Sequence, residues 1–140
     1  MIQLANYSDM AEFHERNADR FADECEAGLP SLPLSSFCTF MFAWQFGGVA
    51  GNGGWGHALR CYADELDLIN GMLVNLGDTQ LAVLIRDCRA LVEKIMNEET
   101  EPDERGKAHD QIDERIDLRF DCLDPLVEKY FDQHFGDTKI

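Results

Sequence analysis

Carboxylate side chains recur at a regular interval near the C-terminus of this chain. Successive members lie mostly three or four residues apart: Asp110, Asp113, Asp117, Asp121, Asp124 and Glu128, with Glu114 beside them. Residues at this spacing share one face of an α-helix, where neighbours lie roughly 5 Å apart. The spacing therefore predicts a column of negative charge comparable to the phosphates of a nucleic acid. A basic protein surface could bind such a column.

Two observations weigh against this interpretation. Arg115 and Arg119 interrupt the column, and surfaces of a single charge sign are common because they keep proteins soluble. A solvated acidic face without a partner is therefore the alternative to a binding surface.

The whole chain is acidic, with 27 Asp and Glu against 12 Lys and Arg in 140 residues and a net charge of -15. This charge repels nucleic-acid phosphates and anionic lipids, so we expect no direct binding to nucleic acid or membrane. The longest uncharged stretch, residues 27–59, is broken by prolines and glycines. We therefore expect neither a membrane span nor a secretion signal, and a cytoplasmic location.

A glycine-rich segment, Gly51-Asn52-Gly53-Gly54-Trp55-Gly56, satisfies the G-x-G-x-x-G pattern of dinucleotide-binding loops. The context is wrong for that function, because the preceding segment has the pattern of a buried aromatic helix and no βαβ alternation follows. We expect a structural role instead. Asn52 is predicted to cap a helix that opens at a buried Trp55, with Gly53 and Gly54 forming the turn.

The cysteines and histidines do not form a recognisable site. The five cysteines are never spaced C-x-x-C, so we expect buried free thiols rather than disulfides or a zinc knuckle. His57 and Cys61 share a helix face and supply half of a zinc site, but no second pair follows. The other histidines lie among acidic residues, where polar faces are expected. We therefore predict a protein that is not an enzyme and has no catalytic residue, metal or cofactor.

Apolar periodicity near 3.6 residues predicts an all-α protein, a compact single-domain bundle of about six helices over residues 1–140. The outline is an N-terminal amphipathic helix (1–30), core helices (34–97), an acidic loop (98–107) and a C-terminal helix pair (108–140). Within the core, glycines 47–56 should stop an apolar central helix. Gly77 and Asp78 should end one helix and cap the next. That next helix, over residues 81–95, has the clearest periodicity.

Three segments together resemble the DNA-mimic protein family. They are Phe46 to Trp55, which contains Val49-Ala50-Gly51-Asn52-Gly53-Gly54-Trp55, the Leu76-Gly77 stop, and Phe120-Asp121-Cys122-Leu123-Asp124. The family's shared domain has a Val-x-Asn-Gly-Gly-aromatic motif, then helices, then Leu-Asp before the last helix. The resemblance covers roughly residues 36–135, and Gly51 is an insertion relative to the motif. It implies an acidic helical fold that binds a DNA-binding transcription regulator in place of DNA.

These observations favour a non-enzymatic inhibitor that binds the basic surface of a DNA-binding protein. An immunity or antitoxin protein that neutralises a toxin is the alternative, because a small acidic inhibitor suits that role equally. A small-ligand-binding protein or an enzyme is the second alternative. The face used and the oligomeric state, including a homodimer, stay open.

Overall fold

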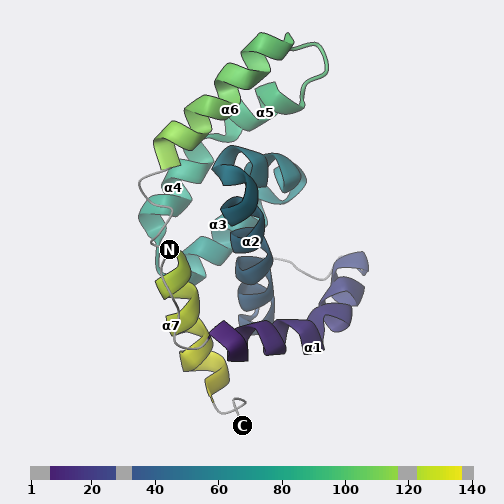
Figure 1. Ribbon diagram of the computed structural model, residues 1–140, viewed down its shortest axis with the longest axis vertical. Coiled ribbons are helices and arrows are strands. Elements are labelled where there is room, and N and C mark those ends of the chain that lie inside the picture. Colours follow the sequence, from purple (N-terminus) through teal and green to yellow (C-terminus); the bar gives the residue numbers. More distant parts are fainter. Residues whose placement is uncertain (1–6, 28–32, 117–122, 137–140) are drawn as a thin grey trace.

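The computed structural model describes residues 7–27, 33–116 and 123–136, and every regular element within these ranges is helical (Figure 1). The predicted all-α class is confirmed. The elements are α1 (Tyr7–Glu26), α2 (Ser36–Cys61), the 3₁₀ turn η1 (Ala63–Glu65), α3 (Leu66–Leu76), α4 (Thr79–Asp87), α5 (Arg89–Met96), α6 (Pro102–Ile116) and α7 (Leu123–Phe135).

Helix α2 is the centre of the structure, as its apolar sequence predicts. The hydroxyl of Ser35 accepts a hydrogen bond from the backbone N–H of Cys38 at 3.1 Å and caps its first turn. Phe40, Met41 and Phe46 are fully buried. Helices α1, α3, α5, α6 and α7 all pack against α2. A helix that is apolar on nearly all faces is stable only when it is enclosed in this way.

Contacts between aromatic rings connect α1 and α7 to α2. The ring of Phe13 on α1 lies 5.4 Å from that of Phe40 on α2 and 5.5 Å from that of Phe131 on α7. Both pairs are edge-to-face, the arrangement that aromatic rings prefer. Phe21 packs in the same way against Phe42, at 5.1 Å. The position of α1 is therefore set by core contacts along much of its length.

The turn between α3 and α4 confirms the predicted stop and cap. Gly77 has φ of 93°, and the N–H groups of Gly77 and Asp78 bind the carbonyls of Val74 and Leu73. This is the hydrogen-bond pattern that ends a helix at a glycine. The Asp78 side chain then accepts from the N–H of Leu81 at 3.0 Å and opens α4.

The predicted acidic loop at 98–107 is wrong over more than half of its length. Helix α6 begins at Pro102, so only residues 97–101 connect it to α5. Proline suits the first helical position, because an N–H group at that position would have no acceptor within the helix. Asp103 and Glu104 in the first turn complement the helix dipole. The lack of apolar residues in this segment reflects an exposed first turn, not a loop.

One further prediction needs correction. The helix expected over 81–95 is divided at Cys88, where ψ is -4°, into α4 and α5. The two helices predicted at the C-terminal end are α6 and α7, and they have different main neighbours. Helix α6 packs mainly on α5 and α2, whereas α7 packs on α2, α1 and α3, lower in Figure 1. None of the described helices is both long and apolar enough to cross a membrane.

Candidate functional site

Helix α2 folds back on itself at Gly54. This residue has φ of 86° and ψ of 172°, and the residues on either side are helical. The ring of Phe46, before the break, lies 5.2 Å from that of Trp55 and 5.5 Å from that of Tyr62, both after it. The second segment therefore turns back across the first. Only glycine adopts such a φ and ψ without strain.

This geometry corrects the expectation that glycines 47–56 stop the helix. The helix continues through the other glycines to Gly53, and the break is at Gly54 alone. Asn52 is exposed and does not cap the segment that opens at Trp55. Trp55 is 2% exposed, as predicted for a core residue.

The cap of the second segment comes from another helix. The N–H of Gly56, in the first turn after the break, donates to Oδ1 of Asp113 on α6 at 2.7 Å. N–H groups in the first turn of a helix have no partner within the helix, and a carboxylate there both accepts the proton and complements the helix dipole. Asp113 is thus turned towards α2 and has a structural contact.

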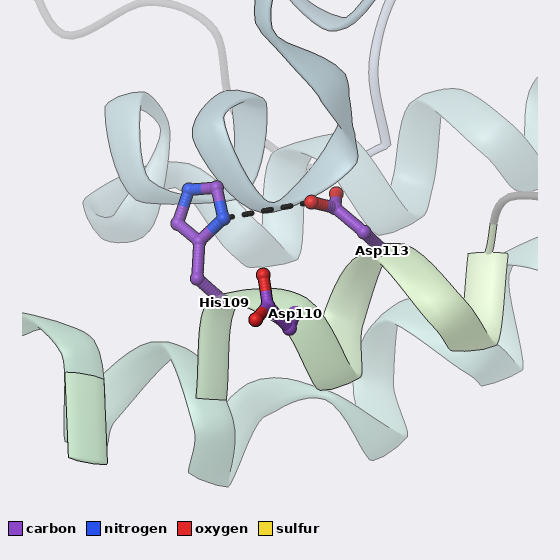
Figure 2. A group of neighbouring side chains, drawn as sticks. All are labelled: His109, Asp110 and Asp113. Carbon is purple, nitrogen blue, oxygen red and sulfur yellow. Dashed lines mark ion pairs between the residues drawn. The ribbon is translucent and has the colours of Figure 1, made fainter. Parts of the chain in front are cut away.

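His109 completes this junction, which we call the α2–α6 clamp: Gly54, Gly56, His109 and Asp113. The Nδ1 of His109 lies 3.5 Å from Oδ2 of Asp113 (Figure 2). A Cβ atom on Gly56 would lie 2.7 Å from that Nδ1 and 3.0 Å from the backbone oxygen of His109. Any larger residue at this position would displace the imidazole of His109. His109 lies among acidic residues, as predicted, but its side chain is only 28% exposed because it also packs against Gly56 of α2.

The structure describes five of the seven carboxylates that were predicted to bind a partner. Asp110 and Glu114 are exposed on α6, while Asp113 belongs to the clamp. Asp117 and Asp121 lie outside the described residues. Asp124 is exposed and Glu128 half-buried on α7. Asp113 is turned inward, and because Asp117 and Asp121 are not described, one continuous column on a single face stays a prediction.

A better aligned set of acids lies on α1 and was missed from the sequence. Five exposed carboxylates follow one another at intervals of three or four residues: Glu12, Glu15, Asp19, Asp23 and Glu26. We call them the α1 acidic row. They extend along about 21 Å of helix. Their spacing in the sequence is the signal that could have identified them.

The basic residues of α1 neutralise little of this row. Arg16 pairs with Glu12 at 3.8 Å, and both side chains are more than half exposed, so the pair adds little stability. Arg20 contacts Phe37 and Glu24, neither of which belongs to the row. Its guanidinium lies 4.0 Å from the centre of the Phe37 ring and 3.6 Å from Glu24. Within the part of the chain that the structure describes, the remaining four carboxylates of the row form no ion pair.

The cysteines differ in burial, whereas all five were predicted to be buried. Cys38 and Cys88 are buried, but Cys25 and Cys61 are exposed, and Cys122 lies outside the described residues. The predicted proximity of His57 and Cys61 is confirmed, since Sγ lies 3.7 Å from Nε2. His57 also lies 3.1 Å from Arg60. His14 is half-buried against Trp44 and Gln45, and burial lowers its pKa.

One group of three side chains has the composition and spacing of metal ligands. His109, Asp110 and Asp113 each offer one ligand atom, and these atoms all lie within 4.8 Å of one another (Figure 2).

Comparison of the chain with protein-family models, with curated proteins and with solved structures finds no match.

Proposed function

We propose that this protein is a non-enzymatic inhibitor that occupies the basic nucleic-acid-binding surface of a partner protein, and so acts as a DNA mimic. A transcription regulator is the partner class that the sequence resemblance implies. The acidic composition excludes most phosphate-binding roles for the chain itself. We expect the protein to act in the cytoplasm, where such partners work.

The observation that carries the proposal is the α1 acidic row. Its carboxylates are regularly spaced, exposed, and neutralised only at Glu12. A DNA-binding surface is built to receive negative charges that recur every few ångströms along an axis. Helix α1 presents charges with that kind of regularity along about 21 Å, which is close to four turns of the helix.

The row is also held rigidly, which favours binding. Met10 and Phe21 on the opposite face of α1 are buried, and Phe13 packs between α2 and α7. Charges on a fixed helix lose less conformational entropy on association than charges on a flexible tail. Electrostatic complementarity of this kind raises association rates and selects among partners.

The acids around α6 are a weaker candidate for the same role. Glu104 lies 3.4 Å from both Lys94 and Lys107, and the hydrogen bond from Lys94, with Lys107 beside it, lowers the pKa of this carboxyl. Two lysines thus interrupt the negative charge there. Figure 1 shows α6 and α1 towards opposite ends of the molecule, so a partner on one face need not contact the other. We therefore assign the contact to α1.

The proposal is tested by capturing partners from host lysate with the wild-type protein and with two charge-reversal variants. The first variant replaces Glu15, Asp19 and Asp23 by Lys in the α1 acidic row. The control replaces Glu98, Glu99 and Glu101 by Lys, which changes the net charge equally in the exposed connection before α6. We expect a DNA-binding protein to be retained by the wild type and the control, and lost with the α1 variant.

Elution at increasing salt extends the test, because exposed charge pairs are screened beyond about 8–10 Å at physiological ionic strength. The retained protein should elute as salt rises. Equal loss with both variants would show a general charge effect and contradict the assignment to α1. Retention of a toxin instead of a DNA-binding protein would favour the immunity alternative, and retention of a metabolite would favour a ligand-binding protein or enzyme.

A further inference from the structure

A second feature, independent of the α1 acidic row, lies at the α2–α6 clamp. On α6, His109 lies four residues before Asp113 and Asp110 lies three residues before it, so each of these two side chains is a neighbour of Asp113 on the helix surface. Their ligand atoms all lie within 4.8 Å of one another. Among the residues that the structure describes, no other set of three His, Cys, Asp or Glu side chains is gathered in this way.

The separation of His109 and Asp113 suits a shared metal ion better than a hydrogen bond. The 3.5 Å between Nδ1 and Oδ2 exceeds the usual 2.7–3.2 Å range of N–H···O hydrogen bonds. Two ligands that each lie about 2.0–2.2 Å from a tetrahedral zinc ion are about 3.4 Å apart. The pair therefore already has the ligand spacing. Asp110 is exposed, and a rotation of its side chain can bring a third ligand oxygen to the ion.

The clamp holds two of these ligands in place. Oδ1 of Asp113 is fixed by the N–H of Gly56 at 2.7 Å, which leaves Oδ2 directed at His109. The imidazole is confined because it lies against the backbone at Gly56, where even a Cβ would collide with it. Hydrogen bonds and packing that orient ligands in this way are typical of metal sites and raise their affinity. Binding through Oδ2 would leave the cap of the second α2 segment intact.

The ligand chemistry selects among ions. An imidazole nitrogen with carboxylate oxygens suits zinc and similar transition ions, whereas Ca²⁺ and Mg²⁺ prefer ligand sets made of oxygen alone. Three protein ligands also leave a coordination position for water, as in open zinc sites. The net charge of -15 raises the local concentration of cations.

From this geometry we propose that His109, Asp110 and Asp113 form a binding site for one Zn²⁺ ion. The ion joins two turns of α6 beside the point where α2 folds back. Binding should therefore raise the melting temperature, because an ion bound only by the folded state stabilises it.

Zinc titration calorimetry of the full chain tests the proposal, with excess Mg²⁺ present to saturate diffuse binding to exposed carboxylates. We expect one ion per chain in the wild type and at least about tenfold weaker binding in Asp110→Asn. Asp110 is exposed, so this variant keeps the fold. Glu114→Gln is the matched control, since it removes the same charge from an exposed position on the same helix and should bind like the wild type.

Cys61→Ser separates the site from the pair formed by His57 and Cys61. We expect this variant to bind zinc like the wild type. Loss of binding in Cys61→Ser with retention in Asp110→Asn would place the ion at that other pair and overturn the proposal. Equally weakened zinc binding in Asp110→Asn and Glu114→Gln would show that only the net charge matters, and would contradict the site. Absence of saturable zinc binding in the wild type would also contradict it.

Discussion

The contact between Asp113 and Gly56 predicts a specific loss of stability in Asp113→Ala. Gly56 is buried, so removal of the carboxylate leaves its N–H without an acceptor in the place where α2 folds back. Loss of a helix cap costs about 0.5–2 kcal/mol, and a buried donor left unsatisfied costs about 1–3 kcal/mol. The Asp113 side chain is 38% exposed, so water replaces part of the lost bond and we expect about 1–2 kcal/mol.

The measurement is thermal and urea unfolding in buffer with EDTA, which removes any contribution from bound metal. For a domain of this size the expected loss lowers the melting temperature by about 3–10 °C. Asp113→Asn keeps an oxygen that can accept the Gly56 N–H and should lose less than Asp113→Ala. Glu114→Ala, exposed on the same helix, should stay within about 0.5 kcal/mol of the wild type. Equal stability of Asp113→Ala and Glu114→Ala would refute the reasoning, because Asp113 would then be an ordinary surface carboxylate.

Two further predictions concern the core and the pH dependence of stability. Trp55→Ala should lower the free energy of unfolding in urea by roughly 3–5 kcal/mol, the range for truncation of a buried aromatic. Trp55→Phe should lower it less, because the indole Nε1 has no hydrogen-bond partner among the described residues. Similar values for the two variants would contradict this. Burial lowers the pKa of His14, so the unfolded chain binds a proton more readily than the folded one, and stability should fall as pH drops from about 7 to 5. His14→Gln should show a smaller fall over that interval, and an unchanged pH profile would exclude this role for His14.

The sequence predicts helix ends correctly where they are set by residues adjacent in the chain. The end of α3 follows from Gly77, which adopts the left-handed conformation, and the start of α4 from Asp78, which caps it. The burial of α2 followed from its apolar composition. Pro102 and the acids after it also carried a local signal, the preference of helix first turns for proline and carboxylates. That signal was outweighed by the absence of apolar residues in the same segment.

The clamp could not be predicted in this way, because its contacts join residues far apart in the chain. The hydrogen bond between Gly56 and Asp113 spans 57 positions. From the sequence Asp113 looked like one member of a regular acidic column, and only the packing of α6 on α2 turns it inward. The α1 acidic row is the opposite case. Its spacing was visible, but exposed acids on an amphipathic helix are usual, so exposure and the position of Arg20 were needed to distinguish the row.

The most direct test of the proposed function is displacement of DNA from a captured partner, followed by fluorescence anisotropy of the labelled DNA. The wild-type protein and the variant with Glu98, Glu99 and Glu101 replaced by Lys should both release the DNA. The variant with Glu15, Asp19 and Asp23 replaced by Lys should fail to do so, while the free wild-type protein leaves the anisotropy of DNA alone unchanged. Equal release by all three proteins would contradict the assignment to the α1 acidic row, and a stable partner–DNA complex at saturating wild-type protein would contradict DNA mimicry itself.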